Sequence, residues 1–101
     1  MTRVVWTLQA AADVQAIHDF IGRDSARYAE VVVDRLLSAV DRLERFPRSG
    51  RVVPELQRED LREVLLGNYR IVYWLVEDRA EVLTVFHSSR LLGPEIGGRA
   101  V

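Results

Sequence analysis

Cysteine and lysine are both absent from the sequence, and each absence limits what the protein can be. Without cysteine there is no disulfide framework, no cysteine-based zinc site and no thiol nucleophile. Without lysine, all 14 basic side chains are arginines, and 15 carboxylates bring the formal net charge to −1. A chain this close to neutrality is not expected to bind nucleic acid by bulk electrostatics, although it can carry a local basic patch.

Long hydrophobic runs are missing as well. The strand-like apolar stretches at 71–76 and 82–86 are far too short to span a bilayer. The first residues contain no apolar core of signal-peptide length. A chain of 101 residues corresponds to one domain, and its 49% hydrophobic content is too high for intrinsic disorder. We therefore expect one soluble, cytoplasmic domain.

The first half of the chain predicts a short strand and two helices. Residues 3–6 favour a strand, and Thr7 fits the N-cap of a helix that ends at Gly22. The expected buried positions of this helix are Leu8, Ala11, Val14, Ile17 and Ile21, with Asp13, Gln15 and Asp19 facing away. Asp24 or Ser25 caps a longer helix that ends at Pro47. Its apolar stripe is Ala29, Val32, Val33, Leu36, Leu37, Val40 and Leu43, extended by Phe46.

In the second half the hydrophobic period changes from 3.6 to 2. After a polar connector, strands are predicted over 61–66, 69–76 and 80–87, with a hairpin turn at Gly67-Asn68. The order β-α-α-β-β-β predicts a two-layer α+β domain, in which a helical hairpin packs on a mainly antiparallel four-stranded sheet. We assign residues 1–92 to this domain. The glycine-rich residues 93–101 are expected to form a flexible tail.

Common catalytic signatures are absent from the sequence. It has no phosphate-binding glycine loop, no nucleophile elbow and no His-Glu-x-x-His motif. The residues one helical turn from His18 are not usual metal ligands. We expect no metal site and no cofactor.

Arginine is concentrated in one region and recurs at two strands. Six guanidinium groups fall within 21 residues: Arg42, Arg45, Arg48, Arg51, Arg58 and Arg62. Such groups can bind carboxylate or phosphate in bidentate fashion, or they can form local surface ion pairs of little net value. Arg70 lies inside a strand and must reach a partner or the sheet edge. Its candidate partners are Glu55, Glu63 and Glu81; alternatively, Arg70 recognises an anion on an open sheet face.

The end of the last predicted strand could also carry a site. His87 and Arg90 are three residues apart there, and a histidine can exchange protons near neutral pH. Acid–base catalysis also requires a second, convergent group, which the sequence does not show.

Several segments share their order and spacing with one group of proteins. They are Val4-Val5-Trp6-Thr7, the helix 11–21, Leu43-Glu44-Arg45-Phe46-Pro47-Arg48-Ser49-Gly50-Arg51, Val53-Pro54-Glu55-Leu56, Leu61-Arg62-Glu63, Tyr69-Arg70-Ile71-Val72-Tyr73 and Val85-Phe86-His87-Ser88-Ser89-Arg90. With these segments the chain resembles the toxins of the RelE/ParE superfamily, the toxic half of type II toxin–antitoxin pairs. The resemblance covers about residues 3–92 and implies the same β-α-α-β-β-β fold.

The resemblance implies one of two activities. RelE-like members are ribosome-dependent mRNA endoribonucleases, and for them it implies a catalytic set of Glu55, Arg62, Arg70 and His87. ParE-like members poison DNA gyrase and need a binding surface in place of a catalytic set. The motifs around Gly50, Arg70 and His87 are more similar to the ParE-like branch, and the near-neutral charge suits it better. We therefore interpret the chain as a ParE-like toxin without a catalytic set. Its candidate target-binding residues are Arg62, Arg70, His87 and Arg90.

A toxin of this kind implies a neutralising partner. The resemblance implies a ParD-like antitoxin of the ribbon-helix-helix type, whose C-terminal segment folds on the toxin. An apolar patch with a basic rim should receive that segment. The candidate antitoxin-binding residues are Val33, Leu37, Val40, Phe46, Arg48 and Arg51. DNA gyrase is the expected target, with the ribosome as the alternative; an inactive homologue that only binds antitoxin is a third interpretation.

Overall fold

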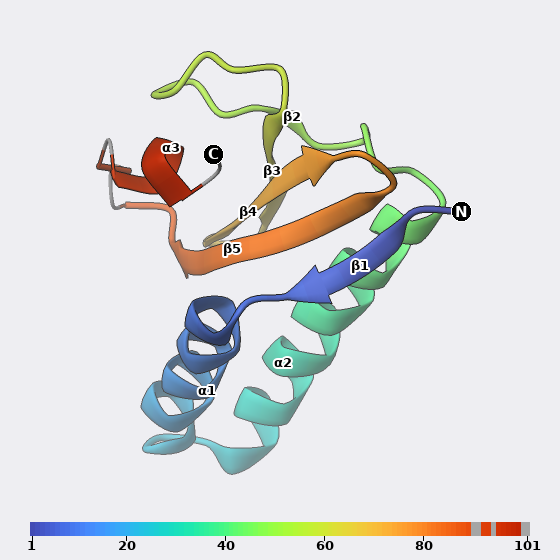
Figure 1. Cartoon of the computed structure of the whole chain (residues 1–101). Helices are drawn as coiled ribbons and strands as arrows, with labels where there is room; N and C mark the ends of the chain where they lie inside the picture. The colour runs from blue at the N-terminus through green and yellow to red at the C-terminus, as the bar shows by residue number, and fades with distance from the viewer. Residues whose placement is uncertain (90–91, 94, 100–101) are drawn as a thin grey trace.

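The architecture is a helical hairpin packed against one face of a five-stranded sheet, seen in a computed structural model that describes residues 1–89, 92–93 and 95–99 (Figure 1). The elements in chain order are β1 (Arg3–Trp6), α1 (Leu8–Gly22), α2 (Ala26–Asp41), a 3-10 turn (Arg42–Glu44), β2 (Arg51–Val52), β3 (Leu61–Leu66), β4 (Tyr69–Val76), β5 (Arg79–His87) and α3 (Glu95–Arg99). The strand order is β1-β5-β4-β3-β2. The β1–β5 pair is parallel and the other pairs are antiparallel, so the predicted α+β class is confirmed.

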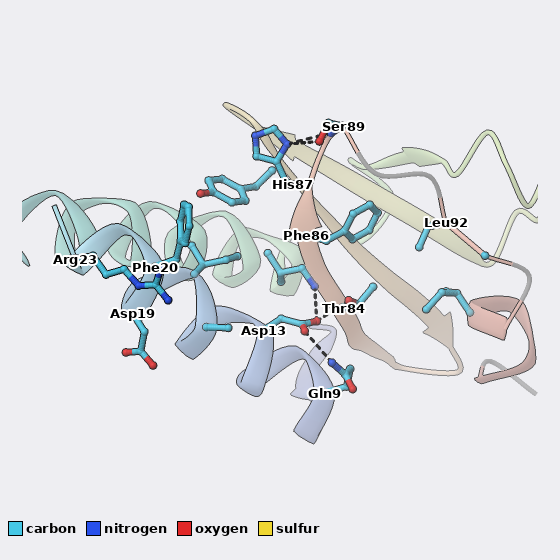
Figure 2. Close-up of a pocket in the computed structure, with 16 residues that line it drawn as sticks. Gln9, Asp13, Asp19, Phe20, Arg23, Thr84, Phe86, His87, Ser89 and Leu92 are labelled. Atoms are coloured by element: carbon cyan, nitrogen blue, oxygen red, sulfur yellow. Dashed lines mark hydrogen bonds between the residues drawn. The ribbon is translucent and has the colours of Figure 1, made fainter. Parts of the chain in front are cut away.

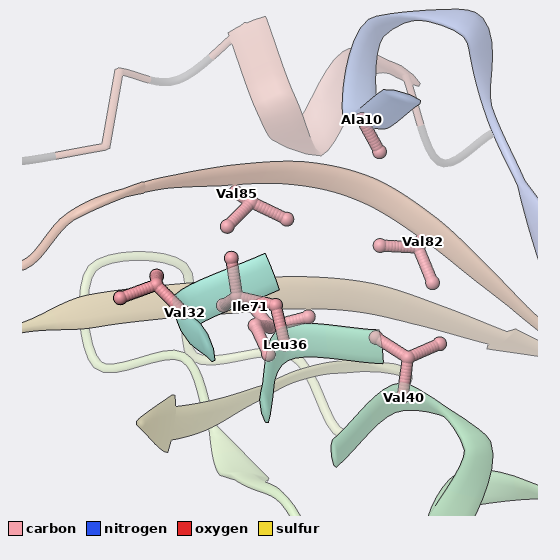
Figure 3. Close-up of a cluster of buried hydrophobic side chains, with 7 residues drawn as sticks. All are labelled: Ala10, Val32, Leu36, Val40, Ile71, Val82 and Val85. Atoms are coloured by element: carbon pink, nitrogen blue, oxygen red, sulfur yellow. The ribbon is translucent and has the colours of Figure 1, made fainter. Parts of the chain in front are cut away.

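The sheet is covered on both faces. Neighbouring residues of a strand point to opposite sides, so each strand contributes to two cores. On the helix side, Ile71 packs among residues of α1, α2 and β5 (Figure 3). On the other side, Val72 packs with Val53 of the connector and Ile96 of α3. Burial on both faces explains why β4 is a nearly continuous apolar run. Figure 1 shows the hairpin below the sheet and α3 above β5.

Helix α1 meets the sheet as predicted over its later turns, where Val14, Ile17 and Ile21 pack against the core, but its first turn differs. Leu8, expected to be buried, is 91% exposed, whereas Ala10 is completely buried. Asp13, expected to face away, accepts hydrogen bonds from β5. The cause is the N-cap: Thr7 accepts from the N–H of Ala10, as predicted, and its hydroxyl also donates to the Val82 carbonyl at 2.6 Å. This tie to β5 turns the face of Ala10 toward the sheet.

Three other differences from the prediction concern where α2 ends, an additional strand and an additional short helix. Ser25 caps α2, which ends at Asp41 and continues only as the 3-10 turn toward Pro47. The connector contains the two-residue strand β2, which raises the strand number from the expected four to five. A two-residue strand is too short to show alternation, and its pairing with β3 is a long-range contact. The expected tail contains α3, whose Ile96 is buried; the flexibility expected of this segment and the boundary at residue 92 stay predictions.

Candidate functional site

A buried ion-pair network lies on the sheet face away from the hairpin, with Arg70 at its centre. Arg70 stands on β4 and is only 6% exposed. Its Nη1 and Nη2 donate to the two carboxylate oxygens of Glu55, each at 2.7 Å. Its Nε donates to Oε1 of Glu63 at 2.6 Å. The guanidinium carbon also lies 5.1 Å from the ring centre of Phe86, within the range of a cation–π contact.

The network extends to the edge strand and to the C-terminal segment. Glu63 stands on β3 with a fully buried side chain, and its Oε2 accepts from Nε of Arg51 at 2.6 Å. Oε2 of Glu55 accepts from the backbone N–H of Leu92 at 3.1 Å. Two arginines and two glutamates therefore alternate, so that each buried charge faces an opposite one. Such pairing is required because an unpaired ion in the interior is strongly destabilising.

The hydrogen bonds between Arg70 and Glu55 shift the pKa of both groups. Those from Arg70 lower the pKa of Glu55 from 4.5 to about 2. The same hydrogen bonds, which Glu55 accepts, raise the pKa of Arg70. Of the two interpretations of Arg70, this geometry is that of an ion pair within the sheet. The partners are Glu55 and Glu63, while Glu81 binds Arg79 at 2.8 Å.

Acid should weaken the fold through Glu55. Because its pKa is depressed in the folded state, its stabilising contribution is complete above about pH 4.5 and is lost as the pH falls toward about 2. We expect the urea concentration at the unfolding midpoint of the wild-type protein to decrease as the pH is lowered through this window. The midpoint of the Glu55→Gln variant should decrease less steeply, since the variant has no carboxylate to protonate at this position. Equal slopes for the two proteins would show that Glu55 does not carry this effect.

The four residues implied as a nuclease set do not converge on one point. Arg70 and Glu55 lie together on the face away from the hairpin. Arg62, opposite Tyr73 in the register, and His87 start from the hairpin side of the sheet. Both oxygens of Glu55 are already bound by Arg70. The described geometry therefore divides the expected set between two faces.

Arg62 fastens the backbone of the arginine-rich loop. Its side chain is 13% exposed, and it donates to the carbonyls of Glu59 at 2.9 Å and Gly50 at 3.1 Å. It also pairs with the Glu59 carboxylate at 2.8 Å. These contacts hold the two ends of the connector together, which is a structural task.

His87 is the exposed member of the expected target-binding group. Its Nδ1 lies 2.8 Å from Oγ of Ser89 and accepts from the Ser89 N–H at 3.2 Å. Its ring makes an edge contact with Tyr69, with centroids 5.9 Å apart. Arg90, the other residue expected here, lies outside the described residues.

The residues expected to bind antitoxin divide into buried and exposed groups. Val40 is completely buried in the core, so its prediction as a contact residue is wrong. Its place on α2, one turn beyond Leu36, makes it part of the face packed on the sheet. Val33 is half-buried. Leu37 and Phe46 are 41% and 57% exposed, and the side chains of Arg48 and Arg51 reach the surface.

A groove that the sequence did not reveal lies between α1 and the end of β5 (Figure 2). It has a volume of about 900 Å³. It opens because β1 ends opposite Val82, whereas β5 continues to His87, leaving its last residues without a strand on that side. Its lining includes Phe20, Arg23, Thr84, Phe86 and Leu92. Phe20 is 66% exposed, and Arg23 lies over its ring at 5.6 Å.

Asp13 closes part of the open β5 edge. Its Oδ2 accepts from the hydroxyl of Thr84 and from the N–H of Val85 at 3.1 Å (Figure 2). The carboxylate therefore takes the place of a neighbouring strand at this N–H. The one sequence signal for it was an acidic residue within an otherwise apolar run of α1.

Asp13→Ala should lower the free energy of unfolding by about 1 to 3 kcal/mol, since Val85 and Thr84 would lose their acceptor. Asp19→Ala is a matched control. Both carboxylates accept from a glutamine four residues earlier, at 2.8 Å and 2.9 Å, but Asp19 is an exposed residue of the groove lining. Urea denaturation of the two variants gives the comparison. Equal losses would mean that the β5 contact contributes nothing.

The described residues contain no group of three or more histidine, cysteine, aspartate or glutamate side chains placed to hold a metal ion. None of the described helices combines the length and the apolar character needed to cross a membrane.

Comparison with known proteins identifies relatives along nearly the whole chain. Residues 4–92 match the family model described as ParE toxin of type II toxin-antitoxin system, parDE. Toxin RelE2 of Caulobacter vibrioides is 35% identical over 91 residues, which cover 90% of this chain and 100% of that protein. The putative toxin Y4kP of Sinorhizobium fredii is 36% identical over 88 residues, covering 85% of this chain and 88% of that protein.

A solved structure supports the same assignment at the level of the fold. It is titled chromosomal ParDE TA system from P. aeruginosa, and it matches with a TM-score of 0.72 at 21% identity. The match covers 86% of this chain and 96% of that chain. Together with the family match, it confirms the resemblance drawn from the sequence motifs: this chain belongs to the ParE toxin family of type II toxin–antitoxin systems, within the RelE/ParE superfamily.

Proposed function

We propose that this toxin acts by inhibiting DNA gyrase and is not itself an enzyme. The observation that supports the proposal is the arrangement of Glu55, Arg62, Arg70 and His87. RNA cleavage through the 2′-OH requires a base, a group that stabilises the charged intermediate and an acid, all around one phosphate. Here the candidate side chains project from two faces of the sheet, and the guanidinium group of Arg70 is already hydrogen-bonded to two carboxylates.

The candidate base is also chemically unsuited to the task. A general base works best when its pKa lies near the operating pH. The pKa of Glu55 is lowered to about 2, and both its oxygens accept from Arg70. Glu55 is therefore suited to a structural ion pair and unsuited to accepting a proton from a ribose hydroxyl.

The proposed target contact uses the exposed end of β5. His87 is exposed there, and it stays a target-binding residue in the proposal, together with Arg90. Arg70 acts indirectly, because it is buried and holds the sheet beneath Phe86. Arg62 also acts indirectly, by holding the arginine-rich loop.

The proposed antitoxin is ParD-like, with a ribbon-helix-helix DNA-binding half, and meets the toxin in the cytoplasm. Its C-terminal segment would place apolar side chains in the groove between α1 and β5. The exposed Phe20 and the apolar Phe86 and Leu92 suit such contacts. Leu37 and Phe46, with Arg48 and Arg51 as a basic rim, offer a second contact surface.

Expression without antitoxin in a bacterial host tests the proposal. We expect growth arrest, a relaxed reporter plasmid and intact mRNA. Codon-specific cuts in translated mRNA with normal plasmid supercoiling would favour the RelE-like alternative and overturn the proposal; one relative is named a RelE toxin. Normal growth at a verified level of folded protein would identify an inactive homologue.

A further inference from the structure

Arg70 shows how this fold saturates an arginine with carboxylates. A guanidinium group has two edges that can donate paired hydrogen bonds: a side edge that includes Nε, and an end edge formed by Nη1 and Nη2. The side edge of Arg70 meets Glu63, with Nε and Nη2 both 2.6 Å from Oε1. Its end edge meets the two oxygens of Glu55. Both edges are therefore occupied within the chain.

Arg51 repeats the first half of this arrangement. Its Nε donates to Glu63, through the other oxygen of the same buried carboxylate, at 2.6 Å. Its end edge differs: Nη1 and Nη2 donate to no residue in the part of the chain that the structure describes. The side chain is 55% exposed, and β2, which carries it, is the edge strand of the sheet. Among the described residues, the position that Glu55 takes on Arg70 is thus open on Arg51.

The backbone around Arg51 is held from two sides. The buried hydroxyl of Tyr73 donates to the Pro47 carbonyl at 2.7 Å and accepts from the Gly50 N–H at 3.0 Å. Arg62 donates to the Gly50 carbonyl. A side chain fixed by a buried partner on a fixed backbone loses little conformational entropy when it binds. Arg51 is therefore organised before any ligand arrives.

We propose that the end edge of Arg51 binds a side-chain carboxylate of a protein partner, and that Glu63 is the positioning residue that aims it. The bound carboxylate would complete on Arg51 the arrangement that Glu55 completes on Arg70. This inference rests on the proposed function in one respect, because it requires a protein partner with acidic residues, such as the antitoxin segment.

A carboxylate suits this place better than a nucleic-acid backbone. The net charge of −1 opposes the binding of a chain of phosphates. A single carboxylate needs one guanidinium edge, which Arg51 offers.

The test uses the full-length protein and three probes: an acetylated peptide of alternating Glu and Leu, the same peptide with Gln for Glu, and a single-stranded RNA decamer. Calorimetry gives the affinities, and the side-chain Nε–H signals of ¹⁵N-labelled arginine report on orientation. We expect the Glu peptide to bind and to shift the Arg51 signal. Arg51→Lys, which keeps the charge but loses the planar end edge, should weaken binding about tenfold.

Control variants separate orientation from charge. Arg27→Lys should leave the affinity unchanged within about twofold. Glu63→Gln should broaden the Arg51 Nε–H signal and weaken peptide binding; if that variant does not fold, Arg51→Lys still decides the question. Three results would each overturn the inference. They are binding of the Glu peptide by Arg51→Lys with wild-type affinity, no binding of the Glu peptide by the wild-type protein, and binding of the RNA in place of the peptide. Gyrase inhibition is measured separately on the wild-type protein and on Arg27→Lys, so a failure of the proposed function would be distinguished from a failure of this inference.

Discussion

Replacing Arg70 with methionine should lower the free energy of unfolding by about 3 to 5 kcal/mol. The variant keeps the aliphatic volume of the side chain but removes the only cation that contacts both Glu55 and Glu63 in the described network. The buried carboxylate of Glu63 would keep Arg51 alone as its partner. Urea denaturation followed by circular dichroism measures the loss.

The same experiment distinguishes a structural Arg70 from a functional one. Arg27→Met, at an exposed position of α2, should change the free energy of unfolding by less than about 0.5 kcal/mol. A folded Arg70→Met protein with wild-type stability and no toxicity would contradict our account, because it would place Arg70 in direct contact with the target.

Gly50→Ala should be the second severe substitution, with a loss of about 3 kcal/mol or more. An added Cβ would lie 2.5 Å from the Tyr73 hydroxyl and 2.6 Å from the backbone carbonyl of Glu63. The carbonyl belongs to a paired strand and cannot move aside without disturbing the β2–β3 pairing. Thermal unfolding of the variant should show a clearly lower midpoint.

Gly98→Ala is the matched control for this change. Outside its own helix turn, no heavy atom of the described residues lies within 4 Å of an added Cβ there, so the midpoint should hardly change. If both alanine variants unfold at the same temperature, the close approach at Gly50 has no energetic consequence, and the preorganisation of the loop that carries Arg51 would lose its basis.

The strands were the most predictable part of the fold. The bounds of β1, β3 and β4 match the sequence prediction. β1 and β4 are rich in β-branched and aromatic residues, and the turn at Gly67 marks the end of β3. Gly67 adopts a φ of +55°, as the tight turn between β3 and β4 requires. Local chemistry alone defines these elements.

Long-range contacts explain what the sequence could not predict. The placement of the first turn of α1 depends on the bond from Thr7 to Val82, 75 residues away. The burial of Val40 depends on which side of α2 meets the sheet. The groove exists because two strands end at different points, and no local pattern records that difference.

The candidate site was predictable in composition but not in pairing. An arginine within an apolar strand required a partner, and two of its three candidate partners were correct. The sequence could not choose among them, since Glu55 and Glu81 are at comparable distances along the chain. It also could not show that Glu63 joins Arg51 to Arg70, which depends on the register of β2 with β3.

The most direct test of the central claim gives the same purified toxin to DNA gyrase and to programmed ribosomes. Supercoiling activity and the trapped gyrase–DNA cleavage complex are measured beside mRNA cleavage, over one range of toxin concentrations. We predict loss of supercoiling, accumulation of the cleavage complex and intact mRNA. Ribosome-dependent cleavage of mRNA with unaffected gyrase would contradict the account.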